Sequence, residues 1–181
     1  MKLRIRNIPA EFSKAIPKGL RLIKKGKDDF LLVESVFCPN GHNLIVDSVR
    51  FHGEFAIKLK VRINNEEGLL FIDPFWGSHA KLFSFIPRLE ENKSTYVEAF
   101  CPYCDVSIIK HFACPNSGCD SHSSIVMLLP ESKNQIRVCA KLGCPGHKLK
   151  IKDLPPAVVN TVSNINFFGV GAYDDFEDLF R

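Results

Sequence analysis

The chain has 181 residues, of which 45% are hydrophobic and 24% charged, and this composition is typical of a globular protein and excludes a disordered one. No stretch approaches the roughly 18 consecutive apolar residues of a membrane span, and the start MKLRIRNIPAEF lacks the apolar core of a signal peptide. We therefore expect a cytoplasmic protein, of one compact domain or two very small ones, with no membrane partner.

The formal net charge of +4 is unevenly distributed. Residues 1–27 contain nine Lys or Arg against Glu11 alone, whereas residues 172–181 contain four acidic side chains against Arg181. A basic segment of this kind can attract phosphate or an acidic protein surface, and it can also be a solvated edge.

The first half of the chain has the patterns of β-strands. LRIRNI alternates apolar and basic residues, and RLIKK and FLLVESVF flank the turn-like GKDD, so residues 1–37 predict a strand, a connector and a hairpin. The alternation of residues 55–63, followed by NNEEG and LLFID, predicts a half-buried hairpin. Its basic face carries Lys58, Lys60 and Arg62, which could contact phosphates or simply be solvated.

Later segments are shorter. PFWGSHAKLFSFIP is rich in aromatic and turn-forming residues and could either cover a small core or form an exposed loop. KLKIKDL predicts a last strand, and AVVNTVSNINFF after Pro155 and Pro156 predicts a short helix with a proline in its first turn.

Four short clusters contain all seven cysteines: FCPNGH, FCPYC, ACPNSGC and VCAKLGC. Proline after the first cysteine, or glycine before the second ligand, lets the backbone curl so that two ligands can reach one tetrahedral ion. In a reducing cytosol, closely spaced cysteines are more often metal ligands than disulfides.

The eight ligands divide into two sets of four. The first predicted set is Cys38, His42, Cys101 and Cys104, and the second is Cys114, Cys119, Cys139 and Cys144. In the second set both halves have the form C-x-x-x-G-C, and SSIVMLLPESKNQIRV between them predicts a hairpin that would bring them together. The first set has to close a gap of 58 residues.

Other ligand sets remain open. The clusters at Cys104 and Cys114 are close enough in sequence to share an ion, and His122 and His147 each follow a cysteine by three residues, so they are possible alternative ligands. Two sets predict two Zn²⁺ ions per chain, although four thiolates can also hold iron.

Knuckles followed by strand-like segments resemble zinc-ribbon and zinc-knuckle domains as a class, over about residues 36–151. The resemblance implies a mainly β fold, small α+β at most, in which β-hairpins are stapled by two zinc sites. We expect four segments: a basic β segment (1–37), a β domain with the first site (38–110), a zinc ribbon with the second site (111–152) and a C-terminal extension (153–181).

CPYC also resembles the active-site tetrapeptide of glutaredoxins, in which Cys101 would be the nucleophile and Cys104 the resolving thiol. That role requires a helix beneath the two thiols, and the nine residues before Cys114 are too few to form the expected one. This pattern favours zinc ligation over thiol chemistry.

The acidic aromatic tail YDDFEDLFR places Phe176, Leu179 and Phe180 on one face of a helical turn or two. A segment this short should become ordered only against a groove of a partner or of its own domain.

No motif of an enzyme is present: there is no Gly-rich phosphate loop, no G-x-S-x-G and no H-E-x-x-H. We therefore predict a non-enzymatic protein-interaction module or accessory subunit without a small-molecule substrate, which binds its protein partner through the tail. The alternative is a zinc ribbon that binds nucleic acid through the basic N-terminal segment.

Overall fold

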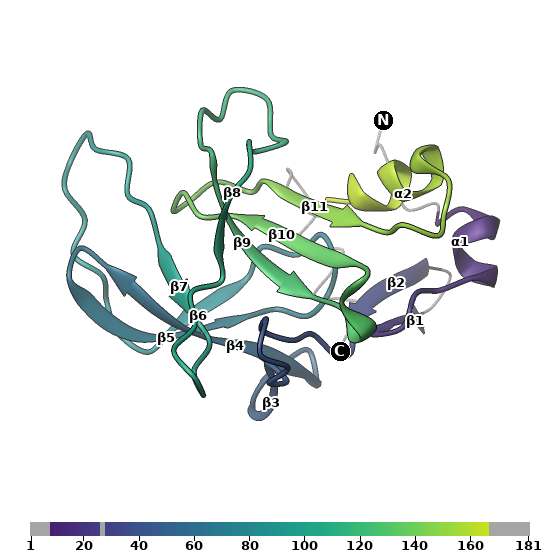
Figure 1. The fold of residues 1–181 in the computed structure, drawn as a ribbon, viewed down its shortest axis with the longest axis horizontal. Helices are drawn as coiled ribbons and strands as arrows, with labels where there is room; N and C mark the ends of the chain where they lie inside the picture. Colours follow the sequence, from purple (N-terminus) through teal and green to yellow (C-terminus); the bar gives the residue numbers. More distant parts are fainter. Residues whose placement is uncertain (1–7, 26–27, 167–181) are drawn as a thin grey trace.

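The computed structural model describes residues 8–25 and 28–166 (Figure 1). It contains eleven strands, two α-helices and one 3-10 turn among these residues. The strands are β1 (Leu20–Lys25), β2 (Asp28–Val33), β3 (Ile45–Phe51), β4 (Glu54–Ile63), β5 (Glu66–Ile72), β6 (Lys81–Phe83), β7 (Glu98–Phe100), β8 (Ile109–His111), β9 (Ser123–Leu128), β10 (Gln135–Cys139) and β11 (His147–Lys150). The helices are α1 (Ala10–Lys14) and α2 (Pro156–Ser163), and the 3-10 turn is η1 (Pro130–Ser132).

All strand pairs in the described part of the chain are antiparallel, and they form three sheets. β1 and β2 form a two-stranded sheet, β11-β10-β9-β8 a second, and β3-β4-β5-β6 a third in which β7 also pairs with β4. The predicted mainly β fold class is confirmed. Figure 1 shows α1 and α2 side by side at one end of the molecule, next to β11 and β1.

The half-buried β4–β5 hairpin predicted from the alternation is present, but its turn is shorter than NNEEG, because Glu66, Glu67 and Gly68 already belong to β5. Asn64 and Asn65 form a two-residue turn with φ of 48° and 66°, and Ile63 pairs with Glu66 across it. Both positive angles match the right-handed twist of the flanking strands, and asparagine tolerates them better than most residues. From Ile57 to Ile63 every second side chain is buried, but Phe55 at the start of the strand is exposed and Ala56 is buried in its place.

The N-terminal part agrees only partly with its prediction. The β1–β2 hairpin is confirmed, but the connector before it contains α1, a five-residue helix that the sequence pattern did not indicate. Phe12 is fully buried, so this helix is held by packing and not by its own length. The strand predicted at residues 3–8 lies, except for Ile8, outside the described residues.

The aromatic stretch after β5 mainly covers the core. Phe75 and Trp76 are buried, and the Trp76 indole N–H donates to the carbonyl of Val162 at 3.0 Å, which ties the stretch to α2. The predicted helix α2 is confirmed, with Pro156 in its first turn.

The main hydrophobic cluster runs from Phe12 to Ile165 and contains residues of all four predicted segments. It includes Cys38 and Cys101 of the first cysteine set, so that set lies at the border of the core. Among the described residues, no helix has the length and apolar character needed to cross a membrane. The tail residues Phe176, Leu179 and Phe180 lie outside the described part of the chain.

Candidate metal centres

The ligand atoms form two groups: site 1 is Cys38, His42, Cys101 and Cys104, and site 2 is Cys114, Cys119, Cys139 and Cys144. The first half of site 1 is the turn between β2 and β3. Gly41 has φ of 86°, its N–H donates to the carbonyl of Cys38 at 3.0 Å, and the Cys38 N–H donates to the carbonyl of His42 at 3.1 Å. Isolated bridges from Phe37 to Asn43 and to Leu128 fix the turn against β9. The backbone therefore brings Cys38 and His42 to the same side of one tight turn.

The second half of site 1 is the knuckle after β7. The Cys101 N–H donates to the carbonyl of Val106 and the Asp105 N–H to the carbonyl of Cys101, both at 3.0 Å. Asp105 closes this turn with φ of 57°, a conformation that aspartate adopts more readily than most side chains. The N–H of Tyr103 donates to the Cys101 sulfur at 3.4 Å.

The two halves meet because β3 and β7 occupy the same edge of β4. β7 ends at Phe100, which pairs with Lys60, and β3 begins at Ile45, which pairs with Ile57. Site 1 therefore lies between the end of β7 and the beginning of β3. This arrangement closes the 58-residue gap between His42 and Cys101.

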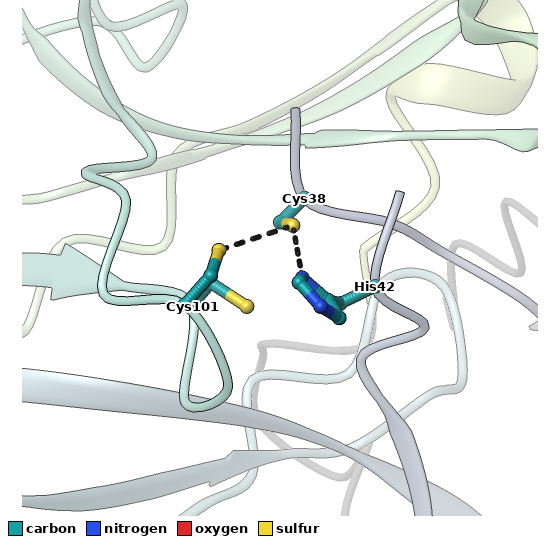
Figure 2. Close-up of side chains that lie close together, drawn as sticks. Cys38, His42 and Cys101 are labelled. Carbon is teal, nitrogen blue, oxygen red and sulfur yellow. Dashed lines mark hydrogen bonds between the residues drawn. The ribbon is translucent and has the colours of Figure 1, made fainter. Parts of the chain in front are cut away.

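The ligand atoms of site 1 have tetrahedral spacing. All four lie within 4.8 Å of one another, with 3.9 Å between the sulfurs of Cys38 and Cys104 and 3.5 Å from the Cys38 sulfur to His42 Nδ1. Zinc bonds of about 2.3 Å to sulfur and about 2.0 Å to nitrogen imply tetrahedral edges of about 3.8 Å and 3.5 Å. Figure 2 shows the side chains of Cys38, His42 and Cys101 pointing toward one another.

Site 2 is built on three neighbouring strands. Cys114 and Cys119 precede β9, Cys139 ends β10, and Cys144 precedes β11. The predicted β9–β10 hairpin is confirmed, and Cys139 pairs with Ser124 at its end. The hairpin therefore brings the two C-x-x-x-G-C halves together.

The two halves of site 2 have equivalent backbones. Gly118 and Gly143, each just before the second cysteine of its half, have φ of 83° and 84°. The N–H of Cys119 donates to the carbonyl of Asn116, and the N–H of Cys144 donates to that of Lys141, both at 3.1 Å. The sequence repeat therefore corresponds to a structural repeat.

The four sulfurs of site 2 also have tetrahedral spacing. They lie within 4.8 Å of one another, with 3.7 Å between Cys114 and Cys144 and 3.9 Å between Cys119 and Cys139. Backbone N–H groups of Asn116 and Gly146 donate to the sulfurs of Cys114 and Cys144 at 3.4 Å. Each of the two four-residue groups can hold a metal ion.

Asparagines next to the ligands donate hydrogen bonds across both sites. Asn40 Nδ2 lies 3.4 Å from the Cys104 sulfur, and Asn116 Nδ2 lies 3.9 Å from the Cys144 sulfur. Such partners orient the ligand and disperse thiolate charge. Sequence reasoning missed this role, although its signal, the repeated tripeptide Cys-Pro-Asn at residues 38–40 and 114–116, is visible.

Lys81 is a second residue that sequence reasoning missed. Burial lowers the pKa of its amine, and the nearby thiolates of Cys139 and Cys144 oppose that change. Four thiolates around a divalent ion carry a net charge of −2, so a nearby ammonium group reduces the cost of burying the site. No local motif marks this lysine, because it comes from β6 of another sheet.

The thiols of the first site differ in acidity. Burial raises the pKa of Cys101 to about 11, whereas a backbone hydrogen bond from Val106 lowers the pKa of Cys104 to about 6. In the second site, burial raises the pKa of the Cys114 and Cys144 thiols. Metal binding must displace these protons.

The alternative histidine ligands belong to neither group of ligand atoms. His122 stacks on His111, with ring centroids 5.5 Å apart. The His147 ring lies between two carbonyl groups, with Nδ1 3.0 Å from Pro145 O and Nε2 2.9 Å from Ile165 O. His147 therefore connects β11 to the chain after α2.

The environment of CPYC differs from that of a glutaredoxin active site. Turn and extended backbone follow Cys104 up to β8, and no helix begins beneath the two thiols. Cys101 is fully buried with a raised pKa, the opposite of what an attacking thiol requires.

In comparisons with known proteins, no family model, curated protein or solved structure matches the chain. The two Cys/His groups are consistent with a metal-binding protein of the zinc-binding class.

Proposed function

We propose that this chain is a non-enzymatic protein that binds two structural zinc ions and serves as a protein-interaction module or accessory subunit. The observation that supports this most directly is that eight ligands form two tetrahedral groups of four. A four-ligand set leaves no position for a catalytic water, so the ions would contribute folding free energy and no chemistry. The Cys₃His composition of site 1 favours zinc over a single iron.

Metal analysis of the purified protein tests the first half of this proposal. We expect about two zinc ions per chain. Cys139→Ser should lose one ion and much of the folding free energy, on the order of several kcal/mol. Ser124 pairs with Cys139 across the β9–β10 hairpin, and Ser124→Ala is the control, which should retain both ions. One ion in the wild-type protein, or iron, would contradict the assignment.

Charge pairing favours a protein partner over a nucleic acid. Lys60 pairs with Asp105 at 2.8 Å, and Arg62 contacts Glu67 and Glu98 at 2.5 and 3.4 Å. These acids largely neutralise the basic face of β4, and a phosphate backbone would have to displace them. In the N-terminal segment, Arg21 likewise pairs with Glu34 and Glu54.

The tail is one proposed docking segment, because Phe176, Leu179 and Phe180 form an apolar face bordered by acidic side chains. Deletion of residues 173–181 should leave the melting temperature and zinc content unchanged and should abolish partner recovery in a pull-down. A truncated protein that unfolds, or that still recovers its partner fully, would refute this role.

A further inference from the structure

Three of the six exposed large hydrophobic side chains in the described part of the chain belong to residues 82–89. Leu82 is 50% exposed, Leu89 58% and Ile86 93%. An isolated exposed aliphatic residue needs no explanation, but three within eight residues form a local concentration. This segment, residues 81–89, includes the edge strand β6 and is referred to below as the edge segment.

The edge segment has one inner and one outer face. Exposure alternates from residue 81 to residue 88, with Phe83 and Phe85 half-buried and packed against the main core, and Leu82 and Ile86 exposed. A period of two places Leu82 and Ile86 on the same side of an extended chain. The apolar residues therefore have two functions here: the phenylalanines attach the segment, and the aliphatic residues face outward.

The inner face is tightly attached to β5. A Cβ at Gly68 would lie 2.2 Å from the Phe85 ring, so the ring packs directly on the backbone of the hairpin. The Ser84 N–H donates to the carbonyl of Leu69 at 2.9 Å, and the Leu69 N–H donates to the Ser84 hydroxyl at 2.8 Å. These contacts fix the chain immediately before Ile86.

The chain immediately after Ile86 is also held. Asn64 Nδ2 donates to the carbonyl of Arg88 at 2.8 Å, and the Arg88 guanidinium pairs with Glu66 at 3.0 Å. Pro87 restricts the backbone of Ile86 to extended conformations. Ile86 is thus held between two anchor points. Its backbone is already fixed before a partner binds, so binding costs it little further conformational entropy.

We infer that Leu82 and Ile86, on the outer face of the edge segment, and the exposed Leu89 that follows them insert into an apolar pocket of a partner protein. This inference rests on the proposed function as a protein-interaction module and names the surface used. A preorganised aliphatic side chain flanked by two others is suited to an anchor at the centre of an interface.

The charges around the segment favour a protein over an anionic membrane or a nucleic acid. Arg88 is paired with Glu66, and Lys93 is paired with Glu90. Glu91 forms no ion pair with any residue that the structure describes. The charged residues next to the edge segment therefore carry no surplus positive charge that would attract phosphate. They favour a partner pocket whose border is neutral or basic.

Site-specific photo-crosslinking in the expressing cells tests the inference. The photoreactive amino acid p-benzoylphenylalanine replaces Leu82, Ile86 or Leu89 in the full chain. Control positions are Phe55 and Tyr103, which are 44% and 53% exposed and line a separate open groove of about 790 Å³. We expect one and the same protein to be captured from the three edge-segment positions and not from the groove.

The captured protein is then purified and titrated with the zinc-loaded chain. Ile86→Ser should weaken binding at least about tenfold, Ile86→Val should bind nearly as the wild type does, and Phe55→Ser should leave affinity unchanged. Zinc content and melting temperature of each variant should match the wild type, which separates a lost contact from a lost fold.

Unchanged affinity in Ile86→Ser overturns the inference, and so does capture from the groove positions alone. Binding of the chain to vesicles of phosphatidylcholine and phosphatidylserine also overturns it if Ile86→Ser abolishes that binding. Self-association lost in Ile86→Ser also overturns it, because the occupant would then be a second copy of the chain. Capture from the groove alone leaves the interaction-module proposal standing, whereas no capture from any position contradicts both.

Discussion

Gly146 lies directly against the sulfur of Cys114: a Cβ added at position 146 would be 2.3 Å from that atom. No heavy atoms approach so closely without bonding, so either the sulfur or the turn before β11 would have to move. Gly143 is also in a site-2 turn, with φ of 84°, but an added Cβ there would meet nothing within 4 Å. A substitution at Gly146 therefore tests a steric clash with a metal ligand, whereas a substitution at Gly143 tests backbone strain without a clash.

Gly146→Ala should reduce the metal content from about two ions per chain to about one, because the Cys114 sulfur is displaced. Gly143→Ala should keep both ions and lose only about 1–2 kcal/mol to the left-handed backbone. Inductively coupled plasma mass spectrometry of both variants measures the difference. Equal metal contents in the two variants would show that the close approach is not what excludes a side chain.

Cys104 should react before Cys101 once metal is removed. With pKa values of about 6 and about 11, Cys104 is largely thiolate at pH 7 and Cys101 is almost entirely thiol. Brief iodoacetamide treatment with chelator, followed by peptide mass mapping, gives the order. Before chelation both should be protected. Rapid labelling of Cys101 alone in the metal-loaded protein would instead support the glutaredoxin-like interpretation.

The chain should bind single-stranded RNA weakly and without dependence on β4. Because Lys60 and Arg62 are paired with acids, we expect an anisotropy titration at about 150 mM salt to show no binding tighter than non-specific levels, with a Kd of about 10⁻⁴–10⁻⁶ M. Lys58→Met, on the same face, should change nothing. Saturable binding that this variant weakens would favour the nucleic-acid alternative.

His79 should make the fold sensitive to mild acid. Burial lowers its pKa to about 4 from the ordinary 6.5, so below about pH 6.5 the unfolded chain binds more protons than the folded one. Stability is therefore lost as pH falls from about 6.5 to about 4. Between pH 7.5 and pH 5, the melting temperature of the wild type should fall a few degrees further than that of His79→Gln.

Protonation of the metal ligands acts equally in both proteins and cancels in this comparison. His111→Gln, which changes an exposed histidine, is the control for the effect of a His→Gln substitution as such. Parallel profiles for wild type and His79→Gln would contradict the prediction.

Elements formed by neighbouring residues could be predicted from the sequence by itself. The knuckle turns depend on Gly41, Gly118 and Gly143, and the β4–β5 reversal depends on Asn64 and Asn65, all of which act through their own backbone angles. The C-x-x-x-G-C repeat with a hairpin between its halves was also enough to predict that the two halves of site 2 meet. In these places the interactions span only a few residues, so composition and spacing determine the result.

Features that depend on sheet pairing could not be derived in this way. The sequence proposed Cys38, His42, Cys101 and Cys104 as one ligand set but left other sets open. Site 1 is completed because β3 and β7 share one edge of β4, and Lys81 lies near the site-2 thiolates because β6 belongs to another sheet that packs beside them. α1 is a helix because the core accepts Phe12, which local propensity does not encode. The sequence determined which residues can serve as ligands, and the pairing of distant strands decided which of them meet.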